Sequence, residues 1–403
     1  MPNPALLIAD RPGAVLRRLA EARPPSLLVT VVAIALVDGA FCLWTGVRMA
    51  DDSHTYAFWS GRLIDSGFDY ASLHAEADPR FPAVLYTLFV TLVALLRLGF
   101  GEAWPAALVA LNLAAHVGLG AMIVRLAQRA TGSGAAGWVA LLLFLGCFDL
   151  LNWVSFAMSD ATFVLLAFIV FTLAARRILG DAKGWLPVVV PATAGIFYRP
   201  TGIVLVPDLI LAFHLSRRPH APVRRGAILA ALVASLVAGL VLFAWLMQDP
   251  GRWPFRILAG AFDFVAQRYA AGEVVSARLE TYHSPPGALI DFVLISVDRF
   301  VHFFALGAGT HSLGHLLVSA AFLLPCYLLG GWLLAALWRG DTDYAAPVRK
   351  LFVTAAGAVL AYGFFHALVQ VDFDWRYRTP ILPHLILLAA GGTADIVRRI
   401  AAR

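Results

Sequence analysis

The chain has 403 residues, of which 60% are hydrophobic and only 14% are charged. A soluble domain is usually about half apolar and about a quarter charged, so this composition excludes an ordinary water-soluble fold. It also excludes a disordered chain, which requires low hydrophobicity and high net charge. The apolar residues form long runs instead of short alternating strands, which excludes a transmembrane β-barrel. The sequence therefore predicts an all-α polytopic membrane protein.

The net charge of +6 does not indicate a nucleic-acid partner. The basic residues lie between apolar runs, as the topology of a membrane protein requires. The three cysteines, Cys42, Cys147 and Cys326, lie within apolar runs at unrelated spacings and match no metal or redox motif. The first apolar run begins too late, and after too many arginines, for a typical cleaved signal. We therefore expect that the first helix is retained in the mature protein. From the distribution of charge, we expect no binding to nucleic acid.

Apolar segments long enough to cross or enter a bilayer recur along the whole chain. A spanning helix needs about 20 apolar residues. The candidate segments lie near 27–47, 81–99, 104–127, 135–150, 160–175, 185–198, 200–215, 226–247, 287–307, 312–338, 347–371 and 379–397. Two of them are unusually charged: 81–99 carries Arg97, and 287–307 carries Asp291, Asp298, Arg299 and His302.

The distribution of basic residues decides how these segments are arranged, because cytoplasmic loops carry an excess of arginine and lysine. Placing 81–99 and 287–307 on the outer face leaves ten spans with both termini in the cytoplasm. The cytoplasmic segments then hold 19 basic and six acidic residues, whereas the rest of the chain holds 12 basic and 19 acidic ones. We therefore expect about 10 transmembrane helices, or up to 12 if both charged segments cross.

The predicted topology gives a single integral-membrane domain over residues 1–403 with two long extracytoplasmic loops. The first loop covers 48–102 and includes the in-plane segment 81–99, and the second covers 248–312. Loops of this length are usually functional or disordered. Because both are rich in aromatic residues and helix formers, we expect ordered helices along the membrane surface.

An acidic pair, Asp51 and Asp52, directly follows the first span. A carboxylate at this depth can act as a general base near the lipid headgroups or as a metal ligand. Adjacent carboxylates raise one another's pKa, which suits a base. The alternative is an N-cap for a helix that runs through Tyr56, Trp59 and Leu63. Capping and catalysis are compatible.

A second acid, Asp160, closes an outward turn that begins at Asp149 and opens the next span. The helix dipole favours an acid at this position, so capping is again the alternative.

Arg199 lies between two short apolar stretches and precedes a proline. An arginine in lipid is costly unless it faces a cavity or a partner. A lipid phosphate is one such partner, and an internal salt bridge to Asp208 or Asp38 is the alternative.

A third polar segment, 372–380, follows the span at 347–371 and carries Arg376 and Arg378. Two guanidinium groups can clamp a phosphate through paired hydrogen bonds. The alternative is an interfacial anchor built from arginine and aromatic residues.

Two acids, Asp38 and Asp208, lie within apolar runs and are candidates for a function or for structural pairing. His311 and His315 are spaced for joint metal ligation, but the outward histidines as a set match no metal signature.

The order of these features resembles the GT-C superfamily of membrane glycosyltransferases, which includes lipid A aminoarabinose transferases and protein O-mannosyltransferases. Asp52 and Tyr56 match the family's acid–three residues–tyrosine pattern after the first span. The segment Ser159–Phe163 resembles the family's second acid, 198–202 its mid-chain arginine segment, and 376–380 its late segment. The chain differs from several relatives in having no large C-terminal soluble domain, which leaves the acceptor undefined.

This resemblance implies an inverting sugar transfer from a polyprenyl-phosphate donor to a glycan, lipid or protein acceptor. Asp52 would act as the general base. Three arginines, Arg199, Arg376 and Arg378, would hold the donor phosphate. Tyr56 and His54 would bind beside them. Asp51 or Asp160 would orient the acceptor or bind a divalent cation. Some family members need a metal and others do not, so metal dependence stays open.

Two other classes of function use similar residues. A transporter or flippase for a lipid-linked or anionic substrate would also need membrane-embedded acids and arginines. Many transporters show internal repeats, and none is visible here. A non-catalytic assembly subunit would not need an acidic pair beside phosphate-binding arginines. The glycosyltransferase hypothesis places the protein in the plasma (inner) membrane of a bacterium, in contact with membrane lipid, with an extracytoplasmic active site.

Overall fold

The computed structural model of the chain describes residues 22–75, 83–217, 256–307, 311–372 and 376–402. The described residues are helical and contain no β-strand; extended pairing is limited to two isolated bridges, Arg48 with Phe156 and Val275 with Val371. The predicted all-α fold class is confirmed for these residues.

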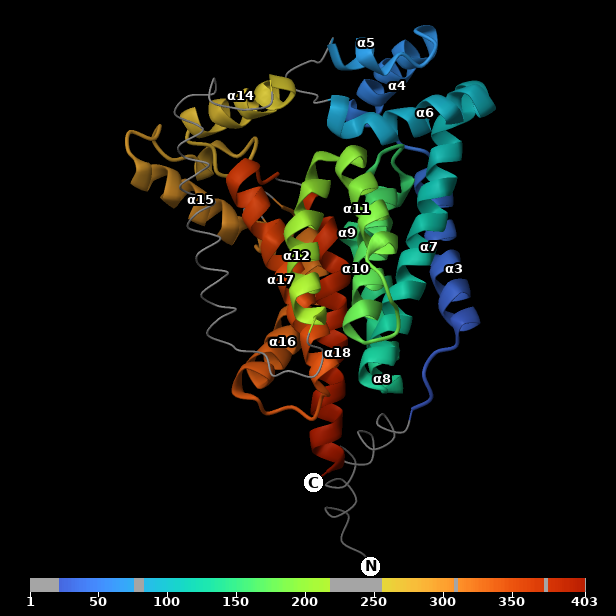
Figure 1. Ribbon diagram of the computed structural model, residues 1–403, viewed down its shortest axis with the longest axis vertical. Helices are drawn as coiled ribbons and strands as arrows, with labels where there is room; N and C mark the ends of the chain where they lie inside the picture. Colours follow the sequence, from blue (N-terminus) through green and yellow to red (C-terminus); the bar gives the residue numbers. More distant parts are fainter. Residues whose placement is uncertain (1–21, 76–82, 218–255, 308–310, 373–375, 403) are drawn as a thin grey trace, which may run out of the picture.

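The helices that form the bundle run along one common direction (Figure 1). They are α3 (Leu27–Thr45), α7 (Trp104–Thr131), α8 (Gly134–Leu145), α10 (Asp160–Ile178), α11 (Leu186–Tyr198), α12 (Leu205–Ser216), α16 (Leu313–Arg339), α17 (Ala346–Val369) and α18 (Leu382–Ala401). The connecting α-helices are α4 (Asp51–Asp65), α5 (Tyr70–Ala75), α6 (Thr87–Phe100), α9 (Phe148–Asn152), α14 (Arg256–Ala270) and α15 (Leu289–Phe303). Short 3₁₀ helices complete the chain: η1 (Ala83–Tyr86), η2 (Gly101–Ala103), η3 (Trp153–Ser155), η4 (Pro200–Val204), η6 (Leu279–Thr281) and η7 (Arg376–Ile381).

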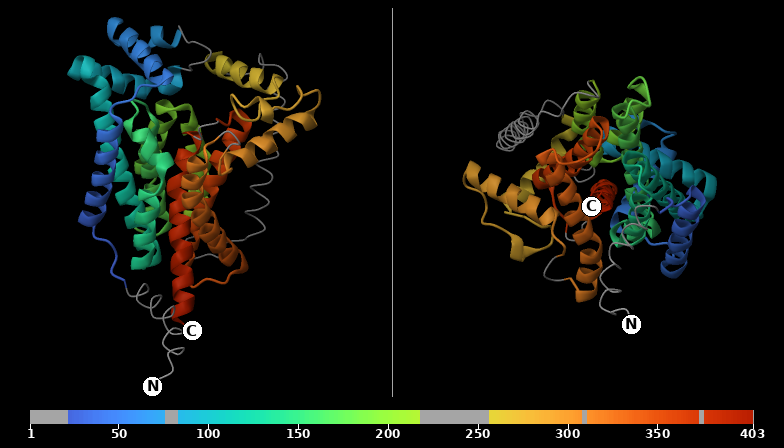
Figure 2. Two further views of the ribbon diagram at one scale, coloured as in Figure 1. Left: turned by 180° about the vertical axis from the view of Figure 1, so that it is seen from behind. Right: turned by 90° about the horizontal axis from the view of Figure 1, so that it is seen from below.

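The helices of both predicted loops gather at one end of the bundle. Figures 1 and 2 show α4, α5 and α6 at the same end as α14 and α15, whereas α3 begins and α18 ends at the opposite end. Within the predicted in-plane segment 81–99, α6 lies across this end of the bundle, and α7 then runs along the bundle (Figure 1). We call the end that carries α4, α5 and α6 the loop end.

Among the described residues, six helical stretches are long and apolar enough to cross a membrane. The pair α8 and α9–η3, bent by 50°, becomes a seventh if it is counted as one broken span. The apolar helices α11 and α12 are shorter, with 13 and 12 residues. The expected span at 226–247 lies outside the described residues. The structure thus supports a helical integral membrane protein, but it does not establish the expected count of about ten spans.

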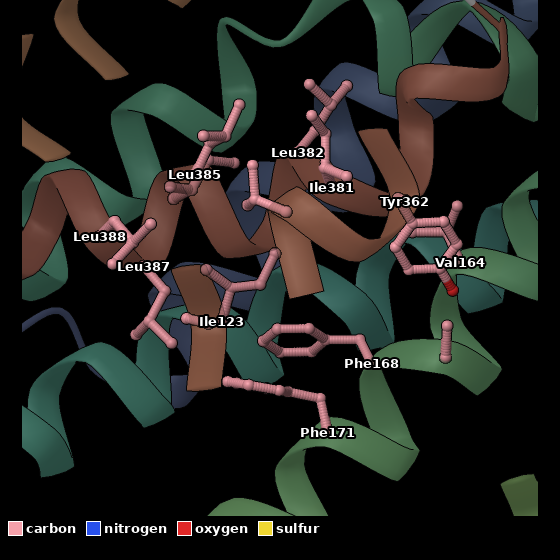
Figure 3. Close-up of a cluster of buried hydrophobic side chains, with 14 of the residues drawn as sticks. Ile123, Val164, Phe168, Phe171, Tyr362, Ile381, Leu382, Leu385, Leu387 and Leu388 are labelled. Atoms are coloured by element: carbon pink, nitrogen blue, oxygen red, sulfur yellow. The ribbon is translucent and has the colours of Figure 1, made fainter. Parts of the chain in front are cut away.

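Helix α18 forms the centre of the bundle. Its apolar side chains pack against α16, α8, α17 and α7, and Figure 3 shows Leu382, Leu385 and Leu388 in this core. At Gly392 the backbone of α18 meets α16 so closely that a Cβ would collide with the Leu329 carbonyl oxygen. The peripheral helix α3 has the opposite character, because Leu28, Leu36, Leu43 and Trp44 are exposed. An apolar helix face that no protein covers suits contact with lipid.

Candidate functional site

The segment after α3 and the segment before α10 are joined side by side at the loop end. Arg48 N donates to the Ser155 carbonyl oxygen at 2.9 Å, and Ala157 N donates to the Arg48 carbonyl oxygen at 2.9 Å. The Arg48 guanidinium adds hydrogen bonds to the Asn152 carbonyl oxygen at 2.7 Å and to Ser155 Oγ at 2.8 Å. These contacts bring the start of α4 next to the start of α10, although more than 100 residues separate them in the sequence.

The acidic pair occupies the first turn of α4. The residue at the cap position is Ala50, and its amide donates to Ser53 Oγ at 3.0 Å. Neither carboxylate is therefore the side-chain cap that the alternative interpretation required. The first turn is still favourable for acids because of the helix dipole. Asp51 and His54 are exposed, whereas the side chain of Asp52 is 39% exposed and turns toward the bundle.

The predicted helix through Tyr56, Trp59 and Leu63 is present as α4, and these three residues form its buried face. Tyr56, Trp59 and Leu63 are at most 5% exposed. The Tyr56 hydroxyl lies 3.5 Å from Ser159 Oγ, directly before α10. Burial raises the pKa of Tyr56 well above its ordinary value, so the phenol stays protonated. Tyr56 thus holds α4 against α10.

Asp160 and Arg199 form a buried ion pair. Arg199 Nη1 lies 2.5 Å from Asp160 Oδ1, and the two side chains are only 5% and 1% exposed. Arg199 adopts an extended conformation between α11 and η4. The turn behind it requires glycine at position 202, where a Cβ would collide with the Gly195 carbonyl oxygen. The internal salt bridge considered for Arg199 is present, but its partner is Asp160.

The two acids considered as partners of Arg199 lie elsewhere in the bundle. Asp38 pairs with His116 at 2.7 Å, and both side chains are buried. Asp208 lines a small cavity between α10, α12, α17 and α18, together with Tyr362 and His384.

Arg376 connects the half-exposed acid to the buried pair. Its Nη2 lies 2.7 Å from Asp52 Oδ2, and its Nε lies 3.6 Å from Asp160 Oδ1. We call Asp52, Asp160, Arg199 and Arg376 the charged cluster. Among the described residues, the second oxygen of Asp160 has no hydrogen-bond partner. The cluster thus combines a half-exposed carboxylate with two guanidinium groups, which is suited to accept a proton beside a bound anion.

Arg378 occupies a different environment from Arg376, although the two residues are only two positions apart. Its side chain is 1% exposed, and its ion-pair partner is Asp149 at 2.6 Å. A second hydrogen bond joins Arg378 Nη1 to the Ala305 carbonyl oxygen at 2.6 Å. Of the three arginines predicted to hold phosphate, the structure brings together Arg199 and Arg376 and directs Arg378 to Asp149.

Aromatic residues surround the charged cluster, and the sequence analysis did not select them. Arg376 lies over the rings of Trp153 and Tyr377, with its guanidinium carbon 5.8 and 5.1 Å from the ring centroids. The ring of Tyr86 is tilted by 51° against that of Tyr56, with the ring centroids 5.6 Å apart, and Tyr86 lies within electrostatic range of the charged cluster. Nothing in the local sequence around Tyr86 marks it, since it reaches the cluster only through the fold.

The charged cluster does not fit a divalent cation. Its buried carboxylate, Asp160, is contacted by two guanidinium groups, and these would repel a metal ion. No group of three or more histidine, cysteine, aspartate or glutamate side chains among the described residues is placed to hold a metal. The rings of His311 and His315 lie 4.1 Å apart, but this pair is not part of such a group.

Comparisons with protein-family models, with curated proteins and with solved structures each found no match. The functional argument for this chain rests on the charged cluster and its surroundings.

Proposed function

We propose that the protein is an inverting membrane glycosyltransferase that transfers a sugar from a polyprenyl-phosphate donor to a glycan, lipid or protein acceptor. The observation that carries this proposal is the charged cluster. Four residues from distant parts of the sequence meet at the loop end and combine one half-exposed carboxylate with two buried or nearly buried arginines. The charged cluster holds the general base and two of the three phosphate-binding arginines that the resemblance to the GT-C superfamily implies.

In the proposed reaction, the acceptor hydroxyl oxygen attacks the anomeric carbon of the donor sugar. The bond from that carbon to the lipid-phosphate oxygen breaks, and the phosphate leaves with the electron pair. Asp52 takes the acceptor's proton, a contribution typically worth about 10²–10⁴-fold in rate. Arg199 and Arg376 stabilise the charge that develops on the leaving phosphate. Attack from the side opposite the phosphate inverts the anomeric configuration.

The proposal includes a topology with about ten spans, cytoplasmic termini and the loop end on the extracytoplasmic side of a bacterial inner membrane. Two observations support it. Both long loops have their helices at the same end of the bundle (Figures 1 and 2). Under this topology, the excess of basic residues lies on the cytoplasmic side. A lipid-linked donor in the outer leaflet would then meet the charged cluster at the membrane surface.

Mass spectrometry of envelope glycolipids and polysaccharides tests the proposal in a strain that lacks this protein. The expected result is the loss of one sugar from one envelope component, with accumulation of the corresponding polyprenyl-phosphate sugar. An envelope with unchanged glycosylation would contradict the proposal.

A transporter or flippase is the second candidate, and it is favoured by polar groups inside the bundle. Asp38 and His116 form a buried pair. Asp208 and Tyr362 line the same small cavity, and the buried Tyr362 hydroxyl has no hydrogen-bond partner among the described residues. Polar groups at this depth mark transport pathways in many membrane proteins. Translocation of a lipid-linked substrate in liposomes, without a glycosidic product, would favour this candidate.

A further inference from the structure

The two arginines of η7 have separate partners, although they share one short segment. Arg376 reaches Asp52 and Asp160, whereas Arg378 reaches Asp149. Both arginines carry the same charge, so charge alone does not explain the division. The difference lies in the contacts of each guanidinium: Arg376 contacts two acids of the charged cluster, and Arg378 contacts Asp149 and a carbonyl oxygen outside it.

Arg378 joins three parts of the chain at one point. One end of its guanidinium contacts Asp149 in α9, and the other donates to the carbonyl oxygen of Ala305, just after α15. Asp149 is 229 positions away from Arg378, and Ala305 is 73 positions away. A planar guanidinium that bonds two acceptors fixes the orientation of its own backbone segment.

The contacts of Arg378 lie two residues from Arg376, which contacts both Asp52 and Asp160. Because Arg376 is two residues before Arg378 in the same 3₁₀ helix, a shift of η7 moves both side chains together. The 2.7 Å contact between Arg376 and Asp52 therefore depends on where Arg378 is held. The guanidinium of Arg378 is 1% exposed, and its two ends are already occupied by Asp149 and by the Ala305 carbonyl oxygen.

We propose that Arg378 and Asp149 are positioning residues, which fix η7 so that Arg376 presents its guanidinium to the donor phosphate. This inference rests on the proposed function, and it replaces the sequence-based expectation that Arg378 binds phosphate directly. Asp149, which the sequence analysis treated only as the start of an outward turn, gains a role through Arg378.

The test measures the affinity of the full chain, in lipid nanodiscs, for a polyprenyl phosphate without a sugar. Arg376→Gln is expected to weaken binding at least tenfold. Asp149→Asn and Arg378→Lys are expected to weaken it at least fivefold, because Asp149→Asn removes the charge of the pair and Arg378→Lys removes the planar guanidinium that bonds Asp149 and Ala305 together. The double variant Asp149→Asn/Arg376→Gln is expected to bind no more weakly than Arg376→Gln alone, since both changes act through Arg376.

A matched control uses an Asp–Arg pair at the opposite end of the bundle. Asp341 lies 3.1 Å from Arg399 and is more than half exposed, so Asp341→Asn is expected to leave affinity unchanged. Thermal unfolding of each variant distinguishes an effect on the position of Arg376 from an effect on the stability of the fold. A merely structural role lowers the unfolding temperature but leaves the affinity of the folded protein unchanged. If Asp149→Asn does not fold, Asp149→Glu replaces it, because it keeps the charge and moves the carboxylate.

Two results would overturn the inference. One is wild-type affinity in folded Asp149→Asn, which would show that the Arg378–Asp149 pair does not position Arg376 for the phosphate. The other is a double variant in which the loss of binding free energy equals the sum of the losses in the two single variants. If the wild-type protein does not bind polyprenyl phosphate, or if Arg376→Gln binds it normally, the proposed function is wrong and the inference falls with it.

Discussion

At the scale of single residues, Asp160 is the acid on which the charged cluster depends. It is 1% exposed, and it neutralises Arg199 directly and Arg376 more distantly. Removing one partner of a buried ion pair leaves an uncompensated charge, which commonly costs about 3–5 kcal/mol. Asp52 differs because it is half-exposed, so water can replace part of the interaction that its loss removes.

This difference predicts that Asp160→Ala destabilises the protein by about 3–5 kcal/mol. Thermal or denaturant unfolding in detergent measures the change. Asp181→Ala is the matched control, because Asp181 pairs with Arg129 at the opposite end of the structure with side chains 29% and 53% exposed. Exposed pairs contribute at most about 1 kcal/mol. Equal stability losses in the two variants would contradict the burial of the Asp160 pair.

The sequence identified the cluster residues better than it identified their partners. Asp52 and Asp160 stand out as acids at the ends of apolar runs, Arg199 as an arginine that is costly in lipid, and Arg376 as a guanidinium able to clamp a phosphate. Their pairing was not predictable, because 39 positions separate Asp160 from Arg199 and 324 separate Asp52 from Arg376, and no local pattern links either pair. The same limit explains Arg378, whose partner Asp149 was visible in the sequence but had no local signal that linked the two.

At the scale of elements, the close approach of α16 and α18 holds the centre of the bundle. Gly392 allows this approach because the Leu329 carbonyl oxygen occupies the space where a Cβ would lie. Small residues at helix contacts are typical of membrane bundles, in which packing replaces the hydrophobic effect. Helix α18 follows η7 directly, so its position also determines where Arg376 lies.

We predict that Gly392→Ala lowers the unfolding free energy by about 1–3 kcal/mol, because the added methyl group forces α16 and α18 apart. Gly331→Ala in α16 is the control, since a Cβ at that position meets no atom within 4 Å. This control should change stability by less than about 0.5 kcal/mol. Comparable losses in both variants would show that alanine itself, and not the helix contact, is responsible.

The apolar runs predicted the starts of α3 and α7 at residues 27 and 104, whereas α7 continues to Thr131, four residues beyond the predicted segment 104–127. Ser26 accepts a hydrogen bond from Val29 N at the start of α3, and Gly132 ends α7 in a left-handed conformation. The break between α8 and α9 was not predicted, because the apolar run 135–150 contains no proline and reads as one helix. The distribution of basic residues predicted that 81–99 does not cross the membrane, and α6 lies across the loop end of the bundle (Figure 1).

At the scale of the whole molecule, the account requires that α4 and the turn between α16 and α17 lie on opposite sides of the membrane. Cysteine labelling tests this arrangement in a variant that lacks Cys42, the native cysteine that is half-buried instead of buried. A membrane-impermeant maleimide is expected to label His54→Cys in intact cells. It should label Asp343→Cys only after the membrane is opened. The reverse pattern would contradict the proposed orientation.

The central claim is that Asp52 is the base of a sugar transfer, and the transfer rate of Asp52→Asn tests it most directly. The rate is measured with purified protein in liposomes, using the donor and acceptor identified from the deletion strain. The account predicts a loss of about 10²–10⁴-fold for Asp52→Asn. Asp65→Asn, at the exposed far end of the same helix, should keep its rate within about twofold of the wild type. Equal rates in the two variants would contradict the role of Asp52.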